Sequence, residues 1–193
     1  MTTILLARHG ETDWNRAGRF QGHADPPLND TGRAQAAELA VELAGVELAA
    51  IYSSPSRRAF ETAVFVAAPH DVAPIALDAL REVDVGSWQG LTRDEIEARF
   101  PEQFARWLNY DQGWHDGETY EEMGRRVITA LLELAAAHAG ERILAVTHGG
   151  PIRAAFASAD GSSHADARRL GPRIGNAFLA EFDVESGALR RLD

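Results

Sequence analysis

With 193 residues, 45% of them hydrophobic and 25% charged, the chain has the length and composition of one soluble globular domain. It contains neither cysteine nor lysine, since all 19 basic residues are arginine, which excludes disulfides, thiolate chemistry, lysine Schiff bases and the Walker lysine. The net charge of −10 opposes binding to nucleic acid or anionic lipid, so a phosphate site would have to be a local pocket of arginines.

The predicted secondary structure alternates short apolar runs with longer amphipathic stretches. In chain order, we expect strands at residues 3–7, 49–53, 74–77, 143–147, 178–184 and 189–192, the third being the weakest. Helices are expected at residues 31–43, 57–67, 120–138 and 152–157, the first of them after the capping signal Asn29-Asp30. This alternation predicts an α/β fold with a mainly parallel central sheet.

The segment at residues 90–117 is charged and aromatic, and Pro101 separates two short helices within it. We expect it to form a small cap beside the sheet. No repeat, low-complexity tract or linker is visible, so residues 1–193 are predicted to form a single domain. The chain starts on a strand without a signal-peptide pattern, which together with the lack of cysteine favours a cytoplasmic location.

Polar side chains follow three of the predicted strands. His9 comes directly after the first strand, and His148 follows the strand at residues 143–147 in the same way. Ser53-Ser54-Pro55 ends a third strand and leads into the helix that carries Arg58. Ligands bind at the carboxyl edge of such sheets, so these side chains are expected to share one site. Glu82, in a loop between apolar residues, is the candidate acid for that site.

Each of these residues also has an ordinary structural interpretation. A single histidine at a strand end is more often structural than catalytic, and a single arginine or glutamate more often forms a surface ion pair. Together they fit one chemistry, in which a neutral imidazole attacks phosphorus, guanidinium groups hold the phosphoryl oxygens and a carboxylic acid faces the leaving oxygen. The combination therefore favours phosphoryl transfer.

Four segments, in this order, resemble the motifs of the histidine phosphatase superfamily, also called the phosphoglycerate mutase-like family. They are Arg8-His9-Gly10-Glu11-Thr12 with Trp14-Asn15, Ser53-Ser54-Pro55 with Arg58-Ala59, Arg81-Glu82 with Gly86 and Trp88, and Val146-Thr147-His148-Gly149-Gly150 with Arg153. The resemblance covers nearly the whole chain, whose length is similar to that of the short phosphatase members. It implies a three-layer α/β/α sandwich.

Position by position, the resemblance implies His9 as the phosphorylated nucleophile and Glu82 as the proton donor, with no metal and no cofactor. The phosphate pocket that it implies consists of Arg8, Arg58 and His148. Substrate contacts are implied for Asn15, Gln21, Gly22 and Gly149. Gln21 departs from the smaller polar residue of the mutases, so the resemblance does not fix the substrate.

The predicted function is hydrolysis of small phosphorylated metabolites through a phosphohistidine. A cofactor-dependent phosphoglycerate mutase is the first alternative, because it would share His9, but we expect no flexible tail after residue 192 to close the pocket. A noncatalytic phosphate-binding module is the second, and a metal hydrolase built on His9, His148 and Glu82 is the third. The expected partner is a small phosphorylated substrate, not nucleic acid or a membrane, and a homodimer is left open.

Overall fold

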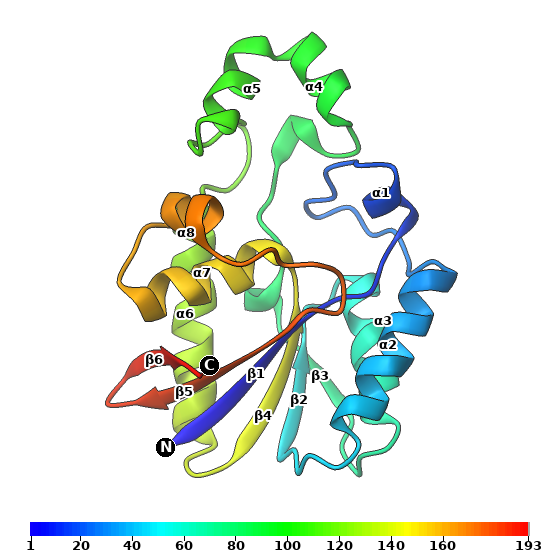
Figure 1. Cartoon of the computed structure of the whole chain (residues 1–193), viewed down its shortest axis with the longest axis vertical. Helices are drawn as coiled ribbons and strands as arrows, with labels where there is room; N and C mark the ends of the chain where they lie inside the picture. The colour runs from blue at the N-terminus through cyan, green and yellow to red at the C-terminus, as the bar shows by residue number, and fades with distance from the viewer. Residues whose placement is uncertain (193) are drawn as a thin grey trace.

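The computed structural model describes residues 1–192, which form a six-stranded sheet in the order β3-β2-β4-β1-β5-β6 (Figure 1). The strands are β1 (Thr2–Arg8), β2 (Ala50–Ser53), β3 (Pro74–Ala76), β4 (Arg142–Thr147), β5 (Leu179–Glu185) and β6 (Ala188–Arg191). The first four are parallel to one another, whereas β5 is antiparallel to β1, and β6 to β5. The predicted α/β fold with a mainly parallel sheet is therefore confirmed.

Both faces of the central strands are buried. In β1, Ile4 and Leu6 point into one apolar core, and Leu5 and Ala7 point into the other. This alternation follows from the pleat of a strand, which sends successive side chains to opposite faces. A strand that is buried on both faces must be apolar throughout, which is why the sequence identifies it as a continuous hydrophobic run.

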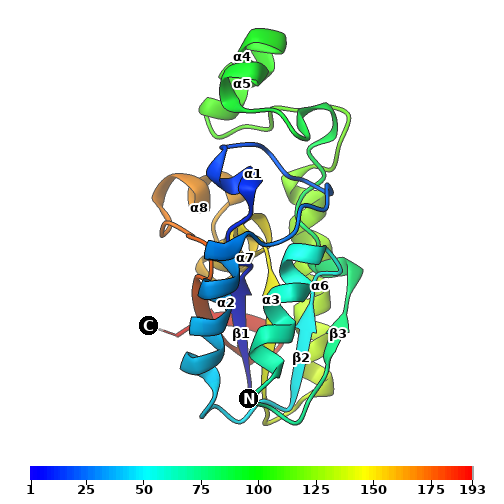
Figure 2. The same ribbon diagram turned by 90° about the vertical axis from the view of Figure 1, so that its right-hand side faces the viewer.

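Helices cover the two faces and make the three layers that the resemblance implied. The helices α2 (Asp30–Leu43) and α3 (Arg57–Ala67) pack on one face, and α6 (Tyr120–Ala137) and α7 (Gly149–Asp160) pack on the other. Figure 1 shows the layers side by side, and Figure 2 shows the face covered by α2 and α3. Asn29 caps α2 as expected, because its side chain accepts a hydrogen bond from the N–H of Gly32 at 2.8 Å.

Residues 90–117, which we call the cap segment, lie beyond the carboxyl edge of the sheet, at the top of Figure 1. They contain α4 (Arg93–Arg99) and α5 (Pro101–Leu108). Pro101 begins α5, where its missing N–H costs no helical hydrogen bond. The cap segment packs on an aromatic cluster around the fully buried Trp88. The other rings of this cluster, with centroids 5.5 to 6.5 Å from that of Trp88, are Phe20, Phe104, Trp107 and Trp114.

Some elements differ from those expected. The helix predicted from residue 152 begins at Gly149, because the extended backbone of His148 already serves as its N-cap. Two short helices, α1 (Asp13–Arg16) and α8 (His164–Leu170), were not predicted, since they are too brief to show a helical hydrophobic period. Within residues 1–192, no helix combines the length and the apolar character needed to cross a membrane.

Candidate active site

A cavity of about 840 Å³ begins at the carboxyl end of β1, where Arg8 and His9 line it, and extends toward the cap segment. Strand register sets up this site, because β1 and β4 pair so that Arg8 lies opposite Thr147. His9 and His148 follow these two residues directly, and their ring centroids are 5.2 Å apart. The structure thus brings together the two histidines that the sequence placed at strand ends.

His9 is only 2% exposed, and its Nδ1 lies 2.7 Å from the carbonyl oxygen of Gly10. A carbonyl can only accept a hydrogen bond, so Nδ1 carries the hydrogen and Nε2 keeps its lone pair. Burial, followed by the charges of Arg58 and Arg8, lowers the pKa of His9 well below its usual 6.5. The ring is therefore neutral at pH 7, with Nε2 located 3.3 Å from Nε of Arg58.

Arg58 and Arg8 flank this imidazole. Arg58 is fully buried and donates to two backbone carbonyls, including that of Gly22 at 3.0 Å. Burial lowers the pKa of Arg58 to about 10, so the group remains charged at pH 7. Arg8 donates to one backbone carbonyl at 2.8 Å, while its buried Nε has no partner in residues 1–192. A buried N–H of this kind is suited to an anionic oxygen.

His148 also has an unpartnered nitrogen, although this fully buried residue is not among those that line the cavity. Its Nε2 lies 2.8 Å from the hydroxyl of Ser54, while its Nδ1 is buried without a partner in the described part of the chain. The Ser54 hydroxyl accepts from the N–H of Ser56 at 3.3 Å and can give its own hydrogen to Nε2. Nδ1 would then carry the hydrogen of the neutral ring. Burial and the charge of Arg58 lower the pKa of His148 well below 6.5.

The carboxylate of Glu82 lies at the N-terminus of α7. It accepts from the N–H of Gly150 at 3.1 and 3.3 Å, and from that of Val83 at 3.0 Å. A Cβ on Gly150 would overlap the Glu82 carboxylate, so the close approach requires glycine at this position. The positive end of the helix dipole and these donors fix the carboxylate at the cavity wall.

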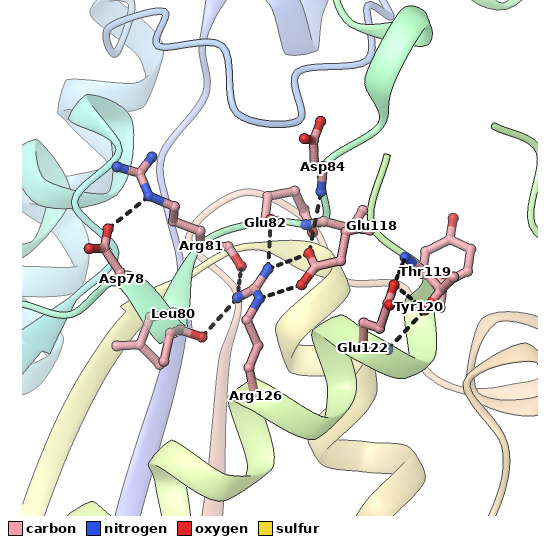
Figure 3. Close-up of polar contacts among 12 residues, drawn as sticks. Asp78, Leu80, Arg81, Glu82, Asp84, Glu118, Thr119, Tyr120, Glu122 and Arg126 are labelled. Carbon is pink, nitrogen blue, oxygen red and sulfur yellow. Dashed lines mark hydrogen bonds and ion pairs between the residues drawn. The ribbon is translucent and has the colours of Figure 1, made fainter. Parts of the chain in front are cut away.

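The main chain around Glu82 is held by Arg126 of α6 (Figure 3). Its guanidinium donates to three carbonyls within residues 79–82 at 2.8 to 2.9 Å. It also pairs with both carboxylate oxygens of Glu118, at 2.6 and 2.7 Å. We call this pair the Arg126–Glu118 clamp. The sequence did not reveal the role of Arg126, because the groups that it holds near Glu82 are backbone carbonyls, which no pattern of side chains indicates.

Three of the four predicted substrate contacts line the cavity: Asn15, Gln21 and Gly22. The Asn15 side-chain oxygen accepts from the N–H of Thr12 at 3.1 Å, so its amide hydrogens are the atoms left for a ligand. The Gln21 side-chain oxygen similarly accepts from the Thr12 hydroxyl at 3.1 Å. Gly149, by contrast, is buried at the start of α7 and is not among the lining residues.

One wall of the cavity, which we call the α7–α8 wall, contains residues to which the sequence interpretation gave no role. Arg153 comes from α7, and His164 and Arg168 come from α8. Aromatic side chains complete this wall, namely Trp107, Tyr110, Trp114 and Tyr120. Arg153 belongs to the last of the four motifs that resemble the family, but the resemblance implied no substrate contact for it. The residues of α8 show no helical hydrophobic period, so the sequence did not indicate this helix.

The site contains histidines and a carboxylate, but their arrangement is not that of a metal centre. Residues 1–192 include no group of three or more His, Asp or Glu side chains placed to hold one ion. His9, His148 and Glu82 therefore do not form such a group, and the arginines beside them would repel a divalent cation.

The chain is a three-layer α/β protein with a buried neutral imidazole, two arginines and a carboxylate at the carboxyl edge of its parallel sheet, groups whose chemistry suits phosphoryl transfer. The family model described as histidine phosphatase superfamily (branch 1) matches residues 4–192. The chain belongs to the histidine phosphatase superfamily.

Individual relatives support the same family. The chain is 35% identical over 158 residues to phosphoserine phosphatase 1 of Hydrogenobacter thermophilus, covering 81% of this chain and 75% of the relative. It is 38% identical over 161 residues to the metal-independent phosphoserine phosphatase of Arabidopsis thaliana, covering 81% and 68%. Its fold matches the structure of Bacillus stearothermophilus YhfR with a TM-score of 0.92 at 33% identity, covering 99% and 95% of the chains. Family and site together make the chain a phosphoric monoester hydrolase.

Proposed function

We propose that the chain hydrolyses small phosphomonoesters through a covalent phosphohistidine on Nε2 of His9. The observation that carries this proposal is a buried, neutral imidazole whose Nε2 lone pair faces Nε of Arg58, 3.3 Å away. Neutrality matters because only the unprotonated nitrogen can attack phosphorus. The attack forms the Nε2–P bond and breaks the bond from phosphorus to the ester oxygen.

The phosphoryl oxygens would be bound by Arg8, Arg58 and His148. Arg8 contributes its unpartnered Nε–H, Arg58 its permanent charge, and His148 the hydrogen on Nδ1. Charge spreads over the equatorial oxygens during in-line transfer, so fixed donors stabilise the transition state more than the bound substrate. Their burial strengthens this effect, since water does not screen them.

Glu82 would move the protons. As a carboxylic acid it donates to the leaving ester oxygen, and as a carboxylate it then takes a proton from the water that attacks phosphohistidine. Hydrolysis returns His9 to its neutral form and releases inorganic phosphate. The Arg126–Glu118 clamp and the N–H of Gly150 would keep the carboxylate in position through both steps.

The remaining substrate contacts are proposed for the residues beside the phosphoryl group. Asn15 and Gln21 would donate from their amide nitrogens, because their side-chain oxygens already accept from Thr12. Gly22 would act mainly by holding Arg58 through its carbonyl, and Gly149 by leaving room for the guanidinium groups of Arg153 and Arg8.

A single-turnover experiment tests the nucleophile. Rapid mixing with phosphorus-labelled substrate, followed by an alkaline quench, should leave acid-labile and base-stable label on the protein. His9→Ala should remove both this label and turnover. A variant that still hydrolyses the substrate at the original rate would contradict the proposal.

Two alternatives predict other outcomes. A noncatalytic phosphate-binding module would bind phosphate without turnover, and a metal hydrolase would lose activity in EDTA and regain it with a divalent ion. We expect turnover to persist in EDTA, because the positive charges of Arg58 and Arg8 beside His9 would repel a divalent cation. Since the chain has no cysteine, we place this activity in a reducing cytoplasm.

A further inference from the structure

The proposed nucleophile depends on which ring nitrogen of His9 carries the hydrogen. Nε2 faces the cationic Arg58, so this nitrogen can attack only if it keeps its lone pair and the hydrogen lies on Nδ1. In a neutral imidazole, the hydrogen bond made by one nitrogen determines the state of the other. Here Nδ1 bonds to the carbonyl oxygen of Gly10 at 2.7 Å. The position of this carbonyl therefore sets the tautomer of His9.

The central sheet does not hold this carbonyl. β1 ends at Arg8, and its pairing with β4 extends to the N–H of His9, which donates to the carbonyl of Thr147 at 3.0 Å. Gly10 lies beyond this ladder, and glycine has more backbone freedom than any other residue. The two peptide groups that meet at Gly10 must therefore be fixed by other parts of the chain.

Helix α3 holds the first of these peptide groups through Thr62. The N–H of Gly10 donates to the hydroxyl oxygen of Thr62 at 3.1 Å. The hydroxyl gives its own hydrogen to the carbonyl of Arg58 at 2.8 Å, which leaves a lone pair to face Gly10. Thr62 is fully buried, as are its α3 neighbours Ala59 and Ala63. An apolar side chain would fill the same space without the cost of burying a hydroxyl, so the bond to Gly10 explains this residue.

Helix α2 holds the second peptide group, which joins Gly10 to Glu11. The side-chain oxygen of Gln35 accepts from the N–H of Glu11 at 2.9 Å. This N–H and the carbonyl of Gly10 belong to one planar trans peptide unit and point in opposite directions, so a bond to one fixes the other. Two glycines permit the close approach of α2. A Cβ on Gly10 would overlap the carbonyl of Gly32, and a Cβ on Gly32 would overlap that of Glu11.

We infer that Thr62 and Gln35 are positioning residues, which set the tautomer of His9 by holding the main chain of Gly10. Neither side chain is among those that line the cavity, so both act through the main chain and not on the substrate. The two helices on one face of the sheet, α2 and α3, thus reach the nucleophile through one carbonyl. The inference rests on the proposed function, because it takes Nε2 of His9 as the attacking atom.

Nitrogen NMR of the protein, labelled in its histidine rings, tests this inference without turnover. Protonated and unprotonated ring nitrogens have distinct chemical shifts, and comparison with His9→Ala identifies the signals of His9. In the original protein we expect the hydrogen on Nδ1. Thr62→Val keeps the shape of the side chain and removes the hydroxyl, and Gln35→Met keeps the length and removes the acceptor. In each variant, the ratio of the Nε2–H form to the Nδ1–H form should rise about fivefold or more, the effect of losing one ordinary hydrogen bond.

Single-turnover kinetics with glycerol 3-phosphate give a second measurement. In Thr62→Val and Gln35→Met, the rate of phosphohistidine formation at saturating substrate should fall about tenfold, and the substrate concentration at half this rate should change less than about twofold. Thr62→Ser keeps the hydroxyl and Gln35→Glu keeps an acceptor oxygen, so each should restore most of the rate. Thr2→Val is the matched control, because Thr2 is also buried, at the other end of β1, and its hydroxyl donates to the carbonyls of Ala135 and His138.

The outcomes separate this inference from the proposed function. A hydrogen on Nε2 of His9 in the original protein would overturn the inference, as would an unchanged tautomer ratio in both Thr62→Val and Gln35→Met. Equal losses of rate in Thr62→Val and Thr2→Val would show that a buried hydroxyl is needed only for stability, and would also overturn it. If Thr62→Val does not fold, Gln35→Met decides, because Gln35 is only half-buried. If no phosphohistidine forms at all, the proposed function fails, while the NMR experiment still decides what sets the tautomer.

Discussion

The imidazoles of the site show how burial sets the chemistry of single residues. His9 and His148 have pKa values well below 6.5, and each lies beside arginines in the interior. A further positive charge is disfavoured there by both desolvation and repulsion. His9 is therefore unprotonated at neutral pH without a neighbouring base, and the two arginines proposed to bind phosphate contribute to this.

His164 should make the stability of the protein depend on pH. Burial and the charges of Arg168 and Arg153 lower the pKa of this ring to about 4 in the native state, against 6.5 in the unfolded chain, so between these values the unfolded chain binds more protons. Stability is thus complete above pH 6.5 and decreases as the pH falls toward 4. For this site alone, the change from pH 7.5 to pH 5 amounts to about 2 kcal/mol.

His164→Phe isolates this effect, because it removes the titration and keeps an aromatic ring against Tyr120. In urea unfolding, we expect the free energy of the original protein to decrease by about 2 kcal/mol more than that of the variant between pH 7.5 and pH 5. Equal decreases in the two proteins would contradict the prediction, whatever the variant's stability at pH 7.5.

Glu82→Gln tests the proton donor. The change preserves the shape of the side chain and its acceptor for Gly150 but removes the acid. We expect hydrolysis of an alkyl phosphate to slow by about 100-fold or more, since an alkoxide leaves poorly without a proton. p-Nitrophenyl phosphate should be affected much less, because nitrophenolate is a good leaving group. A similar loss on both substrates would remove Glu82 from the acid role.

Elements contribute to the site mainly through their ends. The carboxyl ends of β1 and β4 place His9 and His148 side by side, and the first turn of α7 holds Glu82. The middle of α6 also contributes, because Arg126 reaches the carbonyls before and at Glu82. The Arg126–Glu118 clamp thus connects the layer of helices to the loop that carries the acid.

Arg126→Met should therefore resemble Glu82→Gln. We expect kcat on an alkyl phosphate to decrease about tenfold or more, because the carboxylate is no longer held at the leaving oxygen. The double variant should lose little more than Glu82→Gln alone, since both changes act on one step. Arg125→Met, on the exposed side of the same helix, is the control. Fully additive losses would show that Arg126 acts elsewhere.

The elements also show where sequence reasoning succeeds. The strands β1 and β4 are predictable, because burial on both faces demands uninterrupted apolar runs. The helix α8 is not, since only Ala167 of its seven residues is buried and no hydrophobic period can develop. The site divides in the same way. The positions of His9 and His148 are predictable because each residue follows a predicted strand. The Arg126–Glu118 clamp and the α7–α8 wall are not predictable, because they depend on tertiary contacts.

At the scale of the whole molecule, an acidic chain surrounds a strongly basic cavity. The composition predicts this contrast, because a chain of net charge −10 without lysine can bind phosphate only in a pocket of arginines. Composition cannot say how many arginines gather there, since Arg153 and Arg168 reach the cavity only through the packing of α7 and α8.

Cavity size bears on the choice between hydrolysis and phosphoryl transfer to a second substrate. A volume of about 840 Å³ leaves room for water beside a small phosphorylated molecule, so phosphohistidine should be hydrolysed. With 3-phosphoglycerate and a catalytic amount of 2,3-bisphosphoglycerate, we expect release of phosphate to exceed formation of 2-phosphoglycerate at least tenfold. Formation of the isomer in excess would establish a mutase.

The aromatic cluster around Trp88, to which the cap segment contributes three rings, has a practical consequence. The chain has four tryptophans, of which Trp88, Trp107 and Trp114 belong to this cluster. Trp14 is the fourth, and its ring would be 3.3 Å from a Cβ placed on Gly90, at the start of the cap segment. Intrinsic fluorescence therefore reports on the neighbourhood of the cavity and not on the sheet. Ligand titrations can be followed optically without a label, and the emission will record any loosening of the cap before the helical layers unfold.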